Sequence, residues 1–119
     1  MNQRYRLTNP KDFKRVRRTG KSYAHPFIVL AASPNALPIS RFGFTAGRSL
    51  GNAVQRNRAK RRLRHLVQDF HEQILPGWDI VLIARESCLT APWPELRQAF
   101  RELSQRANLL ARMENDYVN

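Results

Sequence analysis

The sequence predicts one α+β domain over residues 1–119, with the order helix, two or three strands, helix, strand, helix. Two short apolar runs, at 27–32 and 80–83, have the length of buried strands rather than of helices. Longer segments on either side of the second run carry apolar residues at helical spacing. A length of 119 residues suits a single domain, and a hydrophobic content of 42% is enough for a core.

The first helix is expected over residues 9–20. Asn9 can cap this helix, and Pro10 suits its first position. Asp12 lies in the first turn, where the helix dipole favours an acid. Gly20 is a natural end for this helix. Phe13 and Val16 share one face, and basic residues cover most of the rest.

Three strands are expected between this helix and the middle of the chain. The first two are a short strand at 22–24 and the apolar run at 27–32, and the turn-rich residues 33–38 follow as a connector. The third, 39–46, alternates between two faces. Its buried face is predicted to carry Phe42, Phe44 and Ala46. Its other face, which is able to meet a ligand, carries Arg41, Gly43 and Thr45.

A long helix is expected from Asn52 to about Leu75, after a loop that contains two glycines. When successive residues are placed about 100° apart around the helix axis, the apolar and the basic residues separate into two arcs. The apolar arc consists of Ala59, Leu63, Leu66, Val67, Phe70 and Ile74. Nearly all of the remaining surface is basic, and Pro76 and Gly77 are predicted to end the helix.

Residues 78–84 form the last predicted strand, and a helix opened by residues 90–94 follows. The apolar residues of that helix are Leu96, Ala99, Phe100, Leu103, Ala107 and Leu110. Trp78 and Trp93 are expected to pack at the starts of their elements rather than to stack on bases. The residues after Met113 are expected to be frayed. A crossover from the third strand through the long helix to the last strand would be right-handed by the general rule.

The net charge of +12 is unevenly placed along the chain. Residues 1–68 carry 16 lysines and arginines and one acid, Asp12, whereas residues 69–119 carry 5 arginines and 8 acids. A surface with so few acids repels itself unless a polyanion neutralises it. Nucleic acid is therefore the first partner expected, an anionic membrane surface the second, and an acidic protein a distant third.

The basic residues concentrate in the segment Arg48–His65, with six lysines and arginines between Arg56 and Arg64. Arginine offers paired donors in one plane, which match phosphate oxygens, and Asn57 adds a neutral donor and acceptor. A basic helix face often faces solvent without binding any partner. Here, the absence of acids between residues 13 and 68 favours a binding surface. A membrane-surface helix is disfavoured because the apolar arc is needed to cover the sheet.

Catalysis by the protein alone finds little support in the sequence. The basic half has one carboxylate, whereas a metal-dependent nuclease needs several, so neither catalytic residues nor metal ligands are predicted. His25, His65 and His71 lack partners at an informative spacing and are expected to face solvent or to pack. The lone Cys88 fits a reducing cytosol. No apolar run has the length of a membrane span, and no secretory signal is expected.

Three functions are compatible with a basic domain of this composition. A structural RNA-binding protein of ribosomal type, without a nuclease, would have the same composition. A DNA-binding helix–turn–helix module is disfavoured because the basic helix follows a strand and a loop. A metal-free ribonuclease would require cleavage by histidine side chains of the protein itself.

The ordered set of motifs resembles the protein component of bacterial ribonuclease P. The residues that carry the resemblance are Gly51, Ala53 and Val54, then Arg56, Asn57 and Arg58, then Lys60, Arg61 and Arg64. Residues 7–16 resemble the first helix of that family, residues 41–45 its strand before the arginine-rich helix, and residues 79–85 its last strand. The resemblance thus extends over most of the chain.

The resemblance implies an α/β sandwich with a left-handed crossover through the arginine-rich helix. It implies a cytoplasmic subunit that assists a catalytic RNA in removing the 5′ leader of precursor tRNA, with Mg²⁺ held mainly by the RNA. Neither DNA nor a membrane is expected as a partner. The residues expected to bind the catalytic RNA are Arg56, Asn57, Arg58, Lys60, Arg61 and Arg64. Those expected to bind the leader are Phe13, Arg17, Arg48 and Arg85.

Overall fold

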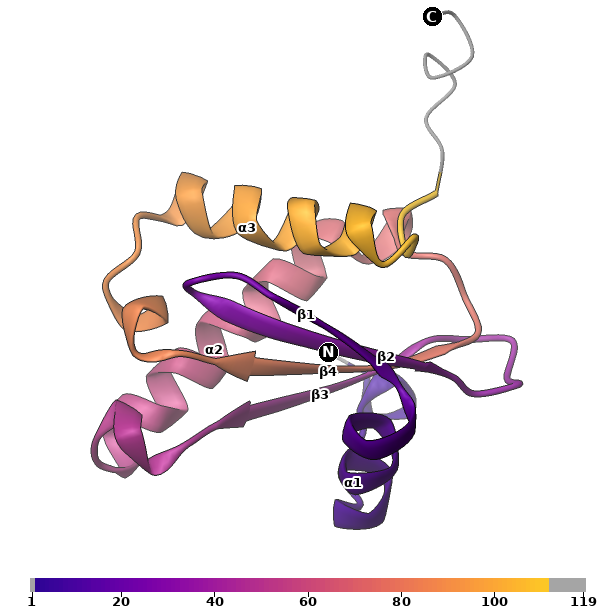
Figure 1. Ribbon diagram of the computed structural model, residues 1–119, viewed down its shortest axis with the longest axis horizontal. Helices are drawn as coiled ribbons and strands as arrows, with labels where there is room; N and C mark the ends of the chain where they lie inside the picture. Colours follow the sequence, from indigo (N-terminus) through magenta and orange to yellow (C-terminus); the bar gives the residue numbers. More distant parts are fainter. Residues whose placement is uncertain (1, 112–119) are drawn as a thin grey trace, which may run out of the picture.

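A four-stranded sheet lies at the centre of the structure, a computed structural model that describes residues 2–111 (Figure 1). Its strands are β1 (Lys21–Ala24), β2 (Ile28–Pro34), β3 (Arg41–Ala46) and β4 (Trp78–Ala84). They lie in the order β1-β2-β4-β3, with β4 antiparallel to β2 and parallel to β3. Every predicted strand is present, including the short β1. The tail after Met113, expected to be frayed, lies outside the described residues.

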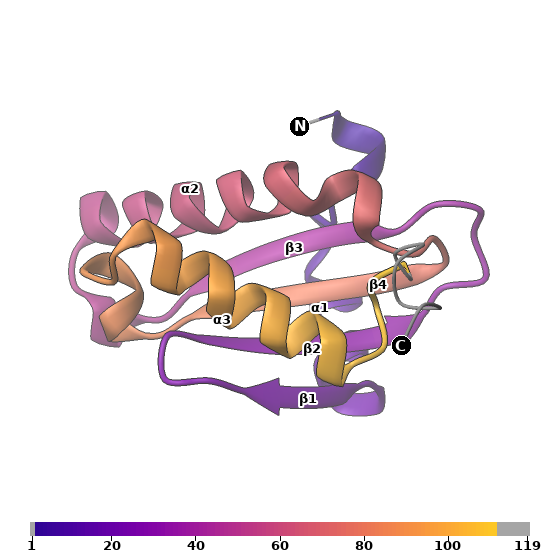
Figure 2. The same ribbon diagram turned by 90° about the horizontal axis from the view of Figure 1, so that it is seen from above.

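Three helices lie on the two faces of this sheet (Figures 1 and 2). They are α1 (Pro10–Thr19), α2 (Ala53–Phe70) and α3 (Trp93–Arg106). Figure 1 shows α1 on one face and α3 on the other, where α2 also lies. The Asn9 side chain accepts a hydrogen bond from the Lys11 backbone N–H at 2.9 Å, and Gly20 follows the last residue of α1, as predicted. The α+β class and the order of elements are confirmed.

The helices cover the two faces of the sheet unequally. On the side of α2 and α3, Leu63, Phe70 and Phe100 are fully buried with Phe42 and Leu82 of the strands in a large apolar core. The smaller core under α1 consists of Leu7, Val16, Ala31 and Val81. Because α1 has only ten residues, it leaves part of its face of the sheet open.

α2 ends at Phe70, short of the predicted end near Leu75. A 3₁₀ turn follows, and the next backbone groups pair with the chain after α3. Ile74 forms a β-bridge with Leu110, and the Leu75 N–H donates to the Leu109 carbonyl at 2.7 Å. A longer α2 would lose these bonds. The same pairing holds Leu110 beyond the end of α3, so its predicted place in the last helix is wrong.

β2 extends further than expected, into the predicted connector at 33–38. Its last two residues lie opposite Asp79 and Trp78 in the antiparallel register with β4. Pro34, which has no N–H, stands at the final position of the strand, where the missing donor is tolerated. The connector therefore begins at Asn35.

The connection from β3 through α2 to β4 is left-handed. β3 and β4 are parallel neighbours, and Figure 2 shows α2 on the viewer's side of the sheet. When Figure 2 is rotated in its own plane until β3 and β4 point upward, α2 lies in front of the sheet and β4 lies to the left of β3. In a right-handed crossover seen from the helix side, the second strand would lie to the right. The general rule gives the opposite hand, so the expectation from that rule is wrong and the one from the resemblance is confirmed.

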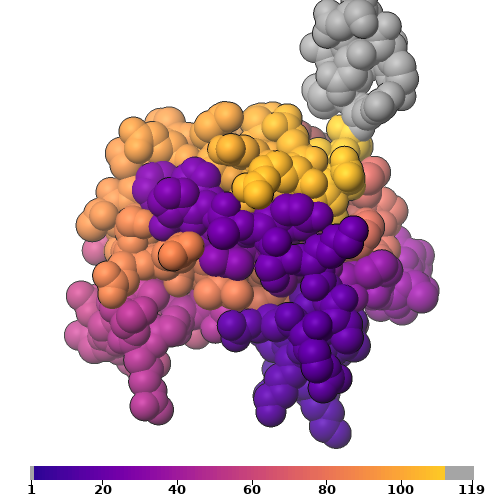
Figure 3. Space-filling view, viewed as in Figure 1, coloured from indigo at the N-terminus to yellow at the C-terminus, as the bar shows by residue number. Residues whose placement is uncertain are grey.

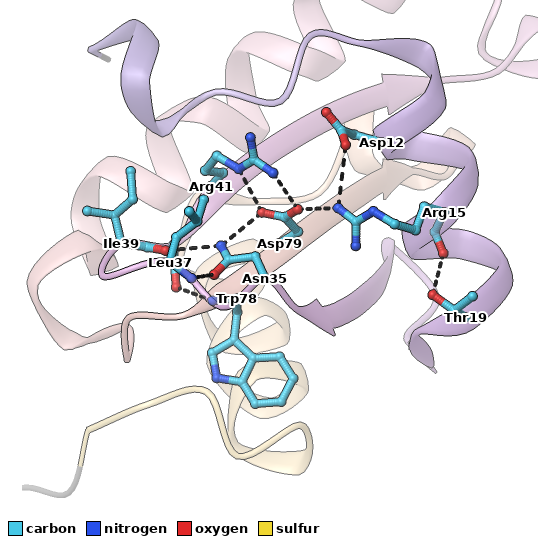
Figure 4. Close-up of polar contacts among 10 residues, drawn as sticks. Asp12, Arg15, Thr19, Asn35, Leu37, Ile39, Arg41, Trp78 and Asp79 are labelled. Atoms are coloured by element: carbon cyan, nitrogen blue, oxygen red, sulfur yellow. Dashed lines mark hydrogen bonds and ion pairs between the residues drawn. The ribbon is translucent and has the colours of Figure 1, made fainter.

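A buried carboxylate ties α1 to this sheet (Figure 4). Asp79 is fully buried at the start of β4, where Arg41 donates to its two oxygens at 2.9 and 2.8 Å. Asn35 donates to Oδ1 at 3.0 Å, and Arg15 of α1 donates to Oδ2. Burial alone would raise the pKa of Asp79, but these hydrogen bonds outweigh it and hold the pKa below its ordinary value.

This network corrects the prediction for the second face of β3. Arg41 is committed to Asp79 and does not present its guanidinium to a ligand. Gly43 lies under the Phe13 ring, so closely that a Cβ at this position would lie 2.6 Å from the ring Cζ. Of the residues predicted to meet a ligand, only Thr45 remains on the uncovered part of the sheet.

Candidate nucleic-acid interface

The basic helix α2 begins with a complete capping box. The Asn52 side chain accepts a hydrogen bond from the Gln55 N–H, and the Gln55 side chain accepts one from the Asn52 N–H, both at 3.0 Å. Gly51 precedes it at a φ of 119°, which favours glycine. The predicted apolar arc is buried against the sheet from Ala59 to Phe70, whereas Ile74, its last predicted member, lies beyond the end of α2 and is half-buried. The remaining surface of α2 is therefore fixed in direction and faces outward.

The six predicted RNA-binding residues lie together on this outward surface, which we call the cationic face: Arg56, Asn57, Arg58, Lys60, Arg61 and Arg64. Three of them are exposed and three are half-buried. Arg56, Lys60 and Arg64 follow at four-residue spacing and form one row along the helix. Within residues 2–111, none of the five cations forms an ion pair with an acid. The cationic face is thus left without an internal counter-charge.

Arg6 extends this row, and sequence reasoning missed it. Burial together with the positive charges of Arg6 and Arg61 lowers the pKa of Arg64, which shows that like charges crowd at this end of the helix. Arg6 reaches the row because its backbone forms a β-bridge with Phe42 of β3. That long-range contact has no signal in the local sequence. A phosphate group would relieve the repulsion among these arginines.

Arg62 is the exception on α2, because its guanidinium turns toward the protein. It donates to the carbonyls of Cys88 and Leu89, in the 3₁₀ turn η4 (Glu86–Leu89), at 2.6 and 3.2 Å, and to the Ala91 carbonyl at 2.6 Å. The connector between β4 and α3 is thereby fixed to α2. Carbonyl oxygens carry no net charge, so this anchor does not neutralise the basic surface.

Arg62→Met is expected to lower the free energy of unfolding by about 2 kcal/mol, because it removes a charged donor from three carbonyls. Urea denaturation measures this loss. Arg61→Met is the matched control, since Arg61 is exposed and forms no hydrogen bond to another side chain or carbonyl within residues 2–111. The control is expected to change stability by less than about 0.5 kcal/mol. Equal stability of both variants would contradict the anchoring role.

A second surface, the open sheet face, lies beside α1. It consists of Val29, Ile83 and Thr45, which the register places in one row across β2, β4 and β3. All three are half-buried, whereas their neighbours on the opposite face are in the core. Figure 3 shows a hollow beneath the sheet, between α1 and the segment that precedes α2.

The four predicted leader-binding residues lie around this open sheet face. Phe13 is half-buried against the sheet, and Arg17 follows one turn later on α1 and is exposed. Arg48 and Arg85 are exposed; Arg85 directly follows the carboxyl end of β4, and Arg48 lies two residues beyond that of β3. Since these strands are parallel neighbours, both arginines stand at the same edge of the sheet.

The histidines and the cysteine do not form a second reactive centre. His25, His65 and His71 contact three different aromatic residues, on separate elements: Phe27, Trp93 and Tyr5. Burial raises the pKa of Cys88 to about 11, so its thiol stays protonated. Within residues 2–111, no three His, Cys, Asp or Glu side chains group closely enough to hold a metal ion. None of the helices described there has the length and apolar character of a membrane span.

Comparison with known proteins matches the chain to one family. Residues 1–108 match the family model of ribonuclease P. The chain is 41% identical over 109 residues to the ribonuclease P protein component of Herpetosiphon aurantiacus, covering 92% of this chain and 89% of the relative. It is 45% identical over 113 residues to that of Symbiobacterium thermophilum, covering 94% and 98%.

Solved structures of the same kind share the fold. The RNase P protein of Staphylococcus aureus aligns with a TM-score of 0.79 at 28% identity, over 88% of this chain and 96% of the other. That of Thermotoga maritima aligns with a TM-score of 0.75 at 28% identity, over 84% and 96%. The chain therefore belongs to the bacterial ribonuclease P protein component family, whose members are the protein subunit of the RNA-catalysed endoribonuclease that processes the 5′ leader of precursor tRNA.

Proposed function

We propose that the cationic face of α2 is the surface through which this subunit binds ribonuclease P RNA. The observation that carries the proposal is the set of five cations on one helix without an acidic partner within residues 2–111. Arg56, Arg58, Lys60, Arg61 and Arg64 would contact phosphates, and Asn57 would contact a 2′-hydroxyl or a base edge. The whole domain, residues 1–119, then acts as one RNA-binding module.

The open sheet face is proposed to hold the single-stranded 5′ leader of precursor tRNA. Its row of half-buried side chains, of which Val29 and Ile83 are apolar, suits unstacked bases, and the Phe13 ring lies at its border. Arg17 on one side and Arg48 and Arg85 at the strand ends would contact leader phosphates. The protein thereby reduces the repulsion between two large RNAs.

Mg²⁺ is proposed to be held by RNA oxygens in the complex. The carboxylates of the described residues do not fit a metal site: Asp79 is enclosed by Arg15, Arg41 and Asn35, and Asp12 and Asp69 pair with arginines. Phosphate oxygens of the RNA are hard ligands of the kind that Mg²⁺ prefers. The subunit would act with its RNA in the cytoplasm, where precursor tRNA is processed.

Cleavage of precursor tRNA tests this assignment. The substrate is incubated at low Mg²⁺ with the protein alone, with its ribonuclease P RNA alone, and with both. Cleavage is expected to be fastest with both and absent with the protein alone. Cleavage by the protein alone would contradict an RNA catalyst. A rate unchanged by the protein would favour the structural RNA-binding alternative.

Arg48→Ala combined with Arg85→Ala is expected to raise KM roughly tenfold for a precursor with a leader of several nucleotides, because two phosphate contacts are lost. For a precursor with a single leader nucleotide, KM is expected to stay nearly constant. The control pair Arg101→Ala and Arg106→Ala removes the same charge from α3. An equal rise in KM for both leader lengths would contradict leader binding at the strand ends.

A further inference from the structure

A second recess opens on α2, away from α1. It lies between α2 and the connector that leads from η4 to α3, and its volume is about 770 Å³. Its lining includes Arg58, Arg61, Arg62, His65, Thr90 and Trp93. Pockets of a few hundred to a thousand cubic ångströms are typical of small-ligand sites, so the recess is large enough for a nucleotide.

The wall formed by Trp93 is held in place. Trp93 is the first residue of α3 and is half-buried against the core. The Arg62 guanidinium lies 6.0 Å from its ring centroid while it also binds the connector carbonyls. The His65 ring meets Trp93 edge-on, with centroids 6.5 Å apart. The indole therefore presents a fixed aromatic surface to the recess.

The recess is also strongly cationic. Three arginines and a histidine line it, and no Asp or Glu does. Within residues 2–111, Arg58, Arg61 and Arg62 form no ion pair. A ligand that combines a flat ring with an adjacent phosphate matches both walls, because the ring stacks on the indole while guanidinium groups bind the phosphate oxygens. An acidic peptide would satisfy the charges but leave the aromatic wall unused.

We propose that this recess binds one unpaired nucleotide of ribonuclease P RNA, with its base against Trp93 and its phosphates on Arg58 and Arg61. The inference rests on the proposed function of α2 and adds to it a specific pocket on the side of α3. It gives Trp93 a second role beside packing. It also makes the connector, which Arg62 fixes, part of the RNA interface.

Fluorescence tests the base contact directly, because the chain has only two tryptophans. In full-length Trp78→Phe, Trp93 is the sole tryptophan, and saturating ribonuclease P RNA is expected to quench its emission strongly. In the matched variant Trp93→Phe, the remaining Trp78 begins β4, at the opposite end of that strand from the connector. Its emission is expected to stay nearly constant. Equal quenching in both variants, or none at Trp93, would overturn the proposal.

Affinity measured at several salt concentrations provides the second readout. Trp93→Leu is expected to weaken binding of ribonuclease P RNA about tenfold with an unchanged salt slope, since it removes stacking and no charge. Trp93→Phe is expected to restore affinity to within about threefold. Arg61→Ala is expected to reduce the slope by about one. Loss of affinity in Arg61→Ala but not in Trp93→Leu would overturn the proposal that the recess binds a nucleotide. It would leave the proposal that the cationic face binds RNA in place. No loss in either variant would contradict both.

Trp93 packs against the core, so the folding of Trp93→Leu is checked by urea denaturation. If this variant does not fold, the two fluorescence variants decide, because each replaces a tryptophan by phenylalanine. A folded Trp93→Leu that binds weakly, together with no quenching of Trp93 in the Trp78→Phe variant, would show that altered packing causes the loss of affinity. That result would overturn the base contact.

Discussion

Asp79→Ala is expected to lower the free energy of unfolding by about 3–5 kcal/mol. The side chain is fully buried, and its removal leaves Arg15 and Arg41 facing each other without the carboxylate that joins them. It also removes the ionic link between α1 and β4, which Arg15 provides, and leaves only the small apolar core to hold α1 on the sheet. Chemical denaturation of the free protein measures the loss.

Asp69→Ala is the matched control for this prediction. Asp69 pairs with Arg97 at 3.4 Å, and both side chains are more than 40% exposed. Exposed ion pairs contribute at most about 1 kcal/mol, so the control is expected to remain close to the parent protein. A loss in Asp79→Ala no larger than that of the control would show that the buried network does not stabilise the fold.

The same network predicts a dependence of stability on pH. The folded-state pKa of Asp79 is lowered, so the unfolded chain takes up the proton first. The contribution of Asp79 is therefore fully present above its ordinary pKa of about 3.9 and is lost as the pH falls through the folded-state value. The stability of Asp79→Asn is expected to fall less steeply than that of the parent over this acidic range. Parallel profiles would contradict the lowered pKa.

Replacing Arg56, Lys60 and Arg64 together by alanine is expected to weaken binding of ribonuclease P RNA roughly 100-fold or more. Three charge-assisted contacts are lost, and the slope of log affinity against log salt is expected to fall by about three. Filter binding or fluorescence anisotropy at several salt concentrations provides both quantities. Stability is expected to stay the same or to rise, because the loss of the Arg64 charge removes its repulsion with Arg6 and Arg61.

The matched control replaces Arg97, Arg101 and Arg106 of α3 by alanine, which changes the net charge by the same amount. These side chains lie against the rings of Phe70 and Tyr23 rather than on the cationic face. Affinity is expected to fall less than about fivefold, because only long-range attraction is reduced. An equal loss in both triple variants would assign RNA binding to net charge alone and contradict a specific surface on α2.

Local physical rules predicted most of the fold. Asn9, Pro10 and Gly20 set the limits of α1, and the alternation in 39–46 gave the correct buried face of β3. The end of α2 could not be predicted this way, since it depends on pairing with the chain after α3. The hand of the crossover is likewise a property of the whole sheet.

The candidate site could be predicted from the sequence where it depends on the spacing of charged residues. It could not be predicted where tertiary contacts determine the direction of a side chain. A basic helix face follows from the spacing of its cations, whichever partner it binds. The inward turn of Arg62 depends on carbonyls 26 to 29 residues further along the chain. Arg41 has the local pattern of a ligand-facing residue, but Asp79 on the adjacent strand engages it. Only the register of β3 with β4 reveals that pair.

The segment between β3 and α2 determines how the two proposed RNA surfaces are related. β3 contributes Thr45 to the open sheet face, and residues 47–52 lead from its end directly into α2. The buried arc of α2 and the Arg62 anchor fix that helix to the same scaffold. In the proposed complex, the subunit is then a rigid spacer: it sets how far the leader stands from the catalytic RNA, and rotation of surface side chains leaves that distance unchanged.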